Sequence, residues 1–517
     1  MISISVLNKI SQIVGRKNLI TTQDDLIEYA SDATLLKFMP DAVAFPGNSE
    51  EVSQLLLLAT EKGFPVIPRG AGSGMSGGAV PVRGGLVMAM GRFDRILSID
   101  QDNLVCKVEP GVITAHLQKA VEKIGLFYPP DPASLNISSL GGNVAECAGG
   151  LRAVKYGVTR DYVLGLTVVL PTGAIIKTGV ETMKGVAGYD LTRLIVGSEG
   201  TLAVITSITL RLVPKPAAQK TMVAFFADIS TAVRTVSEII RNKIVPSILE
   251  LIDRLCLDCV RAEMDLPIPR NAGAMLLIEV DGDGLLVERE AKMIREVCDR
   301  CGTIKFEEAS GKLESERLWE ARRNVSPSLQ KLGPHKISED IVVPRSRMAE
   351  FVTYLDELGR KYDIPVPAFG HAGDGNLHVN IMIDKENSLE KENAQVLVKT
   401  LFKKVIDMGG TITGEHGIGI TKSPYLEMEI NQESLSLMSR IKKAFDPQGI
   451  LNPGKIFSNF SISFGLAAWS MKFFSVLLQC KAILGQPPIK NINRCAAVFS
   501  PSAFSLSTFS FEYNGKK

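Results

Sequence analysis

A glycine-rich segment near the start of the chain limits the folds open to this sequence more than any other feature. Residues 69–78 match the GxGxxG pattern of dinucleotide-binding Rossmann domains, from Gly72 to Gly77. A Rossmann domain needs a helix to open at the third glycine. Residues 78–85 cannot supply that helix, because they hold a proline and three glycines. The sequence therefore excludes a nicotinamide Rossmann site.

The same segment can still hold an anion. Consecutive backbone N–H groups form a concave nest, and glycines let a phosphate approach the backbone closely. Two later segments, residues 129–134 and 138–150, are rich in prolines, glycines and other small residues, against which a flat ring can lie. We therefore expect these segments to bind a bulky nucleotide. A mobile surface loop is the alternative interpretation of residues 69–78.

The composition is that of a folded protein with several domains. The chain has 517 residues, of which 45% are apolar, and its 58 basic and 56 acidic residues give a net charge of +2. Ordinary apolar content with little net charge excludes intrinsic disorder for most of the chain. A nucleic-acid-binding protein usually carries a clear basic excess, so we expect no nucleic-acid partner. The length predicts about two to four domains.

Local patterns predict alternating helices and strands in residues 40–215. Residues 1–15 have apolar side chains at helical spacing and are typical of an amphipathic helix, not of a secretory signal. Asn48 and Glu51 form a capping pair that begins a helix over residues 50–63. Strands are expected at residues 65–68, 85–90, 105–108, 165–170 and 202–210.

Eight cysteines without a visible secretory signal indicate free thiols in a reducing compartment. Cys256 with Cys259, and Cys298 with Cys301, have the CxxC spacing of zinc and redox sites. Each pair lies in an amphipathic helical pattern, in which residues three apart are neighbours. Packing within helices is therefore the simpler interpretation, and a zinc or redox site is the alternative.

Three of the five histidines lie in two short glycine-rich motifs. His371 and His378 share the first motif, and His416 directly follows Glu415 in the second. Two imidazoles and one carboxylate form a known ligand triad for a divalent metal. We therefore predict that His371, His378 and Glu415 bind a divalent metal, for which zinc, manganese and iron are all suitable. Hydrogen-bonded core histidines at strand ends are the alternative.

In sequence order, these segments resemble the FAD-linked oxidases of the vanillyl-alcohol-oxidase superfamily, which carry a PCMH-type FAD domain. The resemblance covers residues 1–457 and rests on five segments, at residues 69–78, 129–134, 141–150, 197–202 and 451–455. More narrowly, the chain is similar to the flavoprotein D subunits of bacterial glycolate oxidase and to D-lactate and D-2-hydroxyglutarate dehydrogenases.

The resemblance implies an α+β protein. It predicts a two-subdomain PCMH-type FAD-binding domain in residues 1–216 and an α/β cap domain with an antiparallel sheet in residues 217–410. It also predicts that residues 411–457 form a C-terminal segment that returns to the flavin and completes the active site.

Residues 458–517 have no counterpart in this family. They carry six basic residues and one acidic residue. The uncharged stretch at their start, residues 458–471, is shorter than the ~18 residues that a membrane-spanning helix needs. We expect a poorly ordered tail, with peripheral contact to a membrane surface as the alternative.

The resemblance also implies which residues bind FAD. The first loop has no histidine or cysteine that could link the cofactor, so non-covalent FAD is expected. The implied FAD-binding residues are Arg69, Gly70, Ala71, Gly72, Ser73, Gly74, Ser76, Gly77, Gly78, Pro132, Ala133, Ser134, Ser138, Gly141, Gly142, Asn143, Ala145, Gly149, Gly150, Tyr156, Gly157, Gly200 and Asn452.

The substrate-binding and catalytic residues are carried over from the family motifs. His416 matches the catalytic base, and Arg322 matches the arginine that grips the substrate carboxylate. Asn380 matches an asparagine that contacts the substrate. Lys336 is assigned to a lysine that helps in some relatives, although Ser338 is an alternative for that position.

The implied activity is FAD-dependent oxidation of a small D-2-hydroxy acid, glycolate or D-lactate, to the 2-oxo acid. Electrons would pass to an iron–sulfur or electron-transfer partner subunit, or to a quinone. The alternatives are a D-2-hydroxyglutarate dehydrogenase and a flavin subunit that only relays electrons. We expect a cytoplasmic location, with the cytoplasmic face of the membrane as the alternative.

Overall fold

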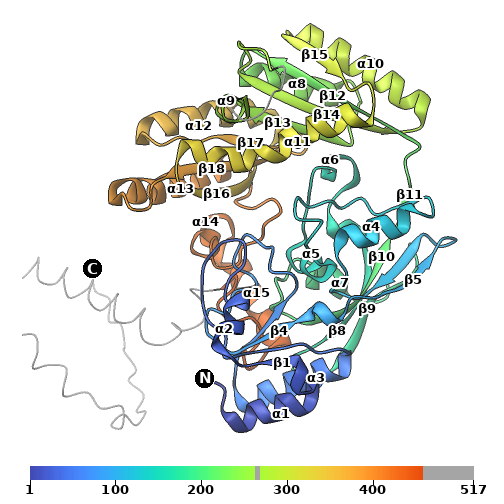
Figure 1. The fold of residues 1–517 in the computed structure, drawn as a ribbon, viewed down its shortest axis with the longest axis vertical. Coiled ribbons are helices and arrows are strands. Elements are labelled where there is room, and N and C mark those ends of the chain that lie inside the picture. The colour runs from blue at the N-terminus through green and yellow to red at the C-terminus, as the bar shows by residue number, and fades with distance from the viewer. Residues whose placement is uncertain (262–267, 458–517) are drawn as a thin grey trace, which may run out of the picture. The chain divides into compact units, whose positions relative to one another are not determined.

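The computed structural model describes residues 1–261 and 268–457, and the α+β class is confirmed. Figure 1 shows an N-terminal domain built on two sheets and a cap domain built on one large sheet. Our expectations for residues 458–517 lie outside the described residues. Among the helices that are described, none has the length and apolar content needed to cross a membrane.

The first sheet of the N-terminal domain has the order β1-β2-β4-β3. Its strands are β1 (Leu19–Ile20), β2 (Ala42–Ala44), β3 (Val66–Arg69) and β4 (Leu86–Ala89), and the last three run parallel. Helices α1 (Ile4–Val14) and α3 (Ser49–Lys62) share a buried core with this sheet, and α2 (Gln23–Leu26) follows β1. The predicted start of α3 is confirmed, because Asn48 accepts a hydrogen bond from the Glu51 N–H. No helix follows β3, as the sequence requires.

The second sheet is antiparallel, with the order β5-β6-β10-β8-β9. Its strands are β5 (Ile96–Asp100), β6 (Val105–Val108), β8 (Val163–Val169), β9 (Ile175–Gly179) and β10 (Val204–Arg211). The connections contain α4 (Thr114–Glu122), α5 (Leu140–Glu146), α6 (Ala153–Tyr156) and α7 (Leu191–Ile195), and β7 (Leu126–Phe127) pairs with β11 (Val213–Pro214).

The cap domain is built on a seven-stranded antiparallel sheet of order β15-β12-β14-β13-β17-β18-β16. The strands are β12 (Ala218–Phe226), β13 (Ile248–Asp253), β14 (Ala274–Gly282), β15 (Lys305–Glu308), β16 (His335–Val342), β17 (Ala368–His371) and β18 (Asn376–Ile383).

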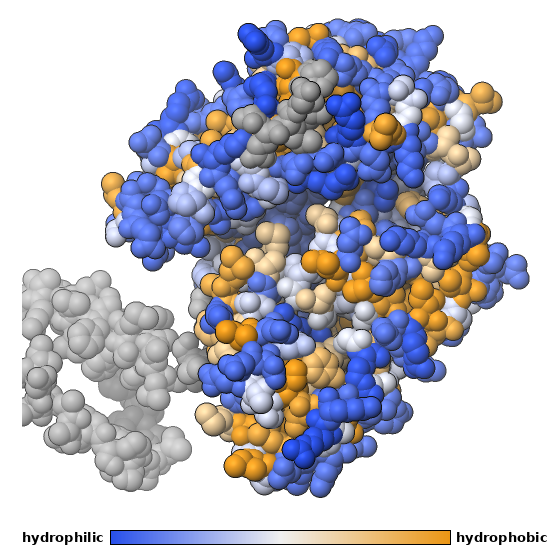
Figure 2. Space-filling model, viewed as in Figure 1, coloured by the Kyte–Doolittle hydropathy of each residue, from blue (hydrophilic) through white to orange (hydrophobic). Residues whose placement is uncertain are grey.

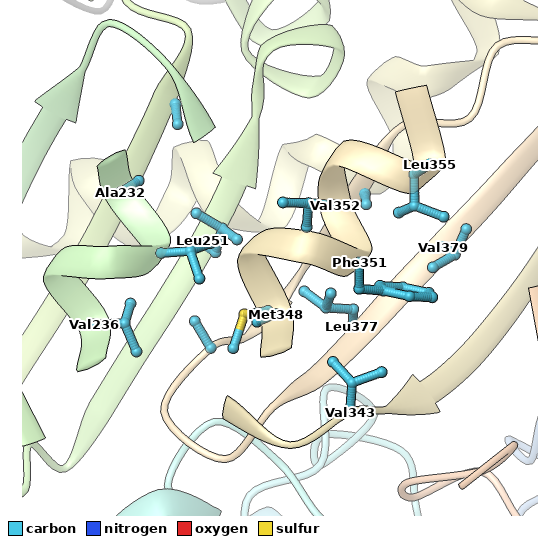
Figure 3. Close-up of a cluster of buried hydrophobic side chains, with 14 of the residues drawn as sticks. Ala232, Val236, Leu251, Val343, Met348, Phe351, Val352, Leu355, Leu377 and Val379 are labelled. Atoms are coloured by element: carbon cyan, nitrogen blue, oxygen red, sulfur yellow. The ribbon is translucent and has the colours of Figure 1, made fainter. Parts of the chain in front are cut away.

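The two faces of this sheet differ because strand side chains alternate between faces. One face packs against α8 (Ile229–Arg241), α10 (Gly284–Cys301), α12 (Met348–Tyr362) and α13 (Ser388–Asp407). Figure 3 shows Leu377 and Val379 of β18 beside Phe351 of α12 in this core. The other face carries α9 (Arg254–Arg261) and α11 (Lys312–Ser328) on its apolar part. Polar side chains, among them those of Glu250, His371 and His378, occupy much of the rest of this face.

The C-terminal segment returns from the cap to the N-terminal domain. After α14 (Leu426–Glu429) and α15 (Gln432–Phe445), Leu451 forms a parallel bridge with Val66 of β3. The Asn452 N–H donates to the Val66 carbonyl, which fixes the chain beside the strand that leads into the glycine loop.

The two CxxC pairs lie in helices, as the packing interpretation expects. Cys256 and Cys259 belong to α9 on one face of the cap sheet, whereas Cys298 and Cys301 belong to α10 on the other. Across residues 1–261 and 268–457, the one group of side chains arranged to hold a metal contains no cysteine. The zinc alternative therefore has no support in the described residues.

Candidate active site

Four strands of the cap sheet place a row of ionisable side chains on one face. Directly opposed residues in antiparallel strands point to the same side. Glu250 of β13 is opposite His371 of β17, and His378 of β18 is opposite Asp340 of β16. Phe369 of β17, which lies on the same face as His371, is opposite His378 and so joins the two pairs. The register of four strands thus collects this row from three distant parts of the sequence.

The loop after β18 and α13 brings the predicted carboxylate to the histidines. Glu415 Oε1 lies 3.5 Å from His371 Nε2 and 3.6 Å from His378 Nε2. It also lies 3.9 Å from Nε2 of His416, whose ring stacks on that of His378 with centroids 5.5 Å apart. The structure therefore brings together all three predicted metal ligands and the predicted base.

Glu250 holds two of the predicted residues at once. Its carboxylate bonds His371 Nδ1, and its Oε2 accepts from Arg322 Nε at 2.6 Å. Burial would raise the pKa of Glu250, but His371 and Arg322 lower it to about 2. With Nδ1 bound to a carboxylate, His371 presents Nε2 to Glu415. A carboxylate on the ring nitrogen that does not face the metal, here that of Glu250 on Nδ1, is typical of histidines that bind metals.

Asp340 fixes the loop that carries Glu415 and His416. Its Oδ2 accepts hydrogen bonds from three consecutive backbone N–H groups, those of Gly414, Glu415 and His416, at 2.8–3.0 Å. Its Oδ1 accepts from the Asn376 side chain at 2.6 Å. Although burial raises the pKa of Asp340, the neighbouring cationic and N–H groups hold it well below its usual value. The carboxylate therefore acts as a fixed anchor under the loop.

The chemistry of this cluster fits a divalent metal. One nitrogen or oxygen atom from each of Asp340, His378, Glu415 and His416 lies within 4.8 Å of the others. Burial lowers the pKa of His378 to about 4, so its imidazole is neutral and can offer a lone pair. Because Asp340 already accepts several hydrogen bonds, we regard the imidazoles of His371 and His378 with Glu415 as the better donor set, which leaves the His416 imidazole free.

A first cavity, here called the loop cavity, is lined by the glycine loop and α5. Of the residues expected to bind FAD, the following line it: Arg69, Gly70, Ala71, Gly72, Ser73, Gly74, Gly78, Pro132, Ala133, Ser134, Ser138, Gly141, Gly142, Asn143, Ala145, Gly149 and Gly200. These residues come from four separate segments of the N-terminal domain. The structure therefore brings most of the expected set to one place.

Six expected residues do not line the loop cavity, namely Ser76, Gly77, Gly150, Tyr156, Gly157 and Asn452. Two of these have other partners that explain their position. Tyr156 donates its hydroxyl to Asp281 of β14 at 2.8 Å, a bond between the two domains. Asn452 Nδ2 donates to the carbonyls of Gly78 and Glu199, at 2.9 and 2.7 Å. Asn452 thus contacts the glycine loop without lining the loop cavity.

A second cavity, here called the cap cavity, has a volume of about 1090 Å³ and lies on the polar face of the cap sheet. Arg322, Lys336 and Ser338 line it, together with His371 and His378. Lys336 Nζ donates to Ser326 Oγ at 2.6 Å, and burial lowers the pKa of Lys336.

Asn380 differs from the other expected substrate residues. It is fully buried, and its side chain bonds the His378 carbonyl and Ser338 Oγ. It does not line the cap cavity. Ser338, the alternative weighed from the sequence, is the residue of this pair that reaches the cavity wall.

The two cavities meet. Met75, Ala133, Glu415 and His416 line both of them. The loop that carries the predicted base is therefore the boundary between the space beside the glycine loop and the space beside the histidines.

Sequence reasoning missed Glu250 and Asp340. Both are fully buried carboxylates, Glu250 in the largely apolar strand β13 and Asp340 in the mixed strand β16. A buried acid rarely stands without a cationic or N–H partner. In the apolar run of β13 that rule marks Glu250 as unusual but does not name its partners, and the polar sequence of β16 gives no such signal for Asp340.

Comparison with known protein families gives two matches. A family described as FAD binding domain matches residues 40–179, and one described as FAD linked oxidases, C-terminal domain, matches residues 215–456.

Curated relatives cover nearly the same residues. The glycolate oxidase subunit GlcD of Bacillus subtilis is 46% identical, over 89% of this chain and 98% of its own length. A D-lactate dehydrogenase of Anaerostipes hadrus is 36% identical, over 84% and 92% of the two chains. The GlcD subunit of Escherichia coli K12 is 33% identical, over 87% and 90%.

Solved structures share the fold at low identity. A p-cresol methylhydroxylase with substrate bound has a TM-score of 0.72 at 18% identity, and the match covers 87% of this chain and 96% of that one. An alkyldihydroxyacetonephosphate synthase has a TM-score of 0.69 at 18% identity, over 88% and 85%. These likenesses support the architecture alone.

Proposed function

The chain belongs to the FAD-linked oxidases, and we propose that it oxidises a small D-2-hydroxy acid, glycolate or D-lactate, to the 2-oxo acid. The observation that carries this proposal is the meeting of the two cavities at Glu415 and His416. Hydride transfer needs the substrate carbon and the flavin in contact. A substrate in the cap cavity and FAD in the loop cavity satisfy that need only at this boundary.

The cluster on the sheet would hold a divalent metal through His371, His378 and Glu415. A bound divalent metal acts as a Lewis acid and lowers the cost of forming an alkoxide from the substrate hydroxyl. Glu250 orients His371, and Asp340 orients the Glu415 loop, so the ligand geometry is set before substrate binds.

His416 and Arg322 act on the substrate itself. His416 would accept the hydroxyl proton, because it lies on the boundary of both cavities and beside Glu415. Arg322 would bind the substrate carboxylate from the wall of the cap cavity. When bound in the loop cavity, FAD would supply the redox chemistry, as the acceptor for the hydride of the substrate carbon.

We expect Arg322→Lys to raise the KM for the hydroxy acid at least about tenfold, because lysine cannot reproduce the guanidinium contacts to both Glu250 and a carboxylate. Arg323→Lys is the matched control, since Arg323 also lines the cap cavity but pairs with the exposed Glu316. Steady-state kinetics of both variants provide the measurement. Equal KM values for the two variants would remove Arg322 from carboxylate binding.

We expect Asn452→Ala to weaken FAD binding about tenfold. The variant leaves the Gly78 and Glu199 carbonyls without their donor in a buried position, and this loosens the glycine loop. Titration of apoprotein with FAD, followed by flavin fluorescence, gives the dissociation constant. Asn103→Ala, in an exposed turn, is the control, and an unchanged dissociation constant for Asn452→Ala would show that the loop does not depend on this contact.

A longer substrate, D-2-hydroxyglutarate, is the second candidate. The volume of about 1090 Å³ exceeds what a two- or three-carbon acid fills, and Lys220 and Lys312 add basic groups to the wall. Turnover of purified protein with glycolate, D-lactate, L-lactate and D-2-hydroxyglutarate, using an artificial electron acceptor, separates the candidates. Turnover of none of the four would favour a flavin subunit that only relays electrons to a partner protein.

A further inference from the structure

Two buried acids from different domains hold the loop that carries His416. Asp340 of the cap sheet accepts the His416 N–H and those of the two residues before it. Glu199 of the N-terminal domain binds the loop just after His416. Its Oε1 accepts from the Ile418 N–H at 2.7 Å, and its Oε2 accepts from the Gly419 N–H at 2.6 Å. The loop is therefore tied to both domains close to the predicted base.

The backbone of Glu199 is itself firmly held. Its N–H donates to the Ala145 carbonyl of α5 at 2.8 Å, and its carbonyl accepts from the Asn452 side chain at 2.7 Å. Its φ of 53° lies in the left-handed region, which is rare outside glycine and persists where the surrounding contacts determine it. The residue is only 5% exposed. A side chain anchored in this way can fix the segment that binds to it.

The glycine loop also contacts this segment. The Ile420 N–H donates to the Ser76 carbonyl at 2.8 Å, and a Cβ on Gly77 would collide with the Ile420 side chain. Ser76 and Gly77 were expected to bind FAD but do not line the loop cavity. In this structure they bind the end of the loop that carries His416.

Gly417 is the residue of the loop that lies closest to Glu199. It has a φ of 80°, and a Cβ there would collide with Glu146 Oε2 and lie 3.0 Å from Glu199 Oε1. The loop therefore fits closely against the N-terminal domain directly after His416, and this position has no room for a side chain.

We infer that Glu199 is a positioning residue that sets the place of His416 relative to the flavin site. Its carboxyl ties the loop to the domain that lines the loop cavity, whereas Asp340 ties the loop to the sheet that carries the predicted metal ligands. This inference rests on the proposed function, because it takes His416 as the base. A displacement of about 1 Å at a reacting group can cost about 10²-fold in rate, so a contact that fixes the loop affects the chemical step.

Glu199→Gln keeps the size of the side chain but places an NH₂ group where one oxygen accepts a backbone N–H. We expect the amides of Ile418 and Gly419 to exchange with solvent at least about tenfold faster, as measured by hydrogen exchange without substrate. We expect the limiting rate of flavin reduction, per bound flavin, to fall at least about tenfold in anaerobic single turnovers. The dissociation constant of the hydroxy acid should stay within about twofold, because the residues that bind it in the cap cavity are unchanged.

Glu109→Gln is the matched control. Glu109 is a buried acid of the same domain that accepts the Arg95 N–H, and it lies outside both cavities. This variant should change neither the exchange of the loop amides nor the rate of flavin reduction.

Gly417→Ala tests the same contact from the side of the loop and decides the question if Glu199→Gln does not fold or does not bind FAD. Its Cβ pushes the loop away from Glu199, so we expect the same faster exchange and slower flavin reduction. Gly409→Ala is its control. Gly409 has a φ of 76°, and a Cβ there would meet no described atom within 4 Å, so this variant imposes the same backbone strain without moving the loop.

Wild-type exchange of the loop amides in Glu199→Gln would overturn the inference, and so would faster exchange with an unchanged rate per bound flavin. A dissociation constant that rises in step with the loss of rate would show that the whole site is disturbed, and would also contradict it. A wild-type flavin that no hydroxy acid reduces would count against the proposed function instead. The exchange data, which need no substrate, would still decide whether Glu199 holds the loop.

Discussion

His416→Ala should lower turnover by at least about 100-fold while the protein keeps its bound FAD. General-base catalysis contributes about 10²–10⁴ in rate, and His416 is the histidine that borders both cavities. Its side chain does not belong to the glycine loop or to α5, so the flavin absorbance should be retained. Steady-state turnover and the flavin spectrum of the same preparation provide the measurement.

His116→Ala is the matched control for this variant. His116 is exposed on α4, away from both cavities, and its replacement should leave turnover unchanged. If His416→Ala turns over at the wild-type rate, proton transfer to this imidazole is not part of the reaction.

His378→Ala should abolish metal binding and therefore lower turnover by at least about 100-fold. His378 Nε2 lies 3.6 Å from Glu415 Oε1, and a triad without one imidazole binds a divalent metal far more weakly. We expect about one metal ion per wild-type chain and a small fraction of that in the variant. Elemental analysis beside the turnover assay tests both statements.

Chelation supplies an independent version of the same test. Metal-free wild-type protein should lose its turnover and regain it on addition of zinc, manganese or iron(II), and the order of recovery identifies the preferred ion.

His335→Ala is the control for His378→Ala and should keep both metal and turnover, because His335 lies at the start of β16 and its Nδ1 accepts from the Lys385 N–H. Metal-free protein with full activity would leave the histidine cluster without a catalytic role.

The local elements were predictable because their signals are local. Asn48, Glu51 and Gly63 fix the ends of α3, and the strand expected at residues 105–108 is β6 without any shift. The absence of a helix after the glycine loop followed from its proline and glycines. Nothing local sets the order of the seven strands in the cap sheet. The family resemblance predicted that the sheet is antiparallel but did not predict the order of its strands.

The residues of the candidate site show the same difference between local and long-range signals. His371, His378 and Glu415 could be predicted because unusual residues gather in short motifs. Glu250 and Asp340 could not, because each meets its histidine through a strand register that joins distant residues. Side chains alternate between the two faces of a strand. Lys336 and Ser338 are two residues apart on β16, so both face the cap cavity.

The most direct test of the account is anaerobic mixing of the FAD-loaded protein with glycolate, D-lactate and D-2-hydroxyglutarate, followed by the flavin absorbance. We predict that one of these acids bleaches the flavin in a single turnover, and that deuterium at its C2 slows the bleaching, because the C2 hydrogen leaves as hydride. A flavin that stays oxidised with all three acids, in protein that holds both FAD and metal, would contradict the account.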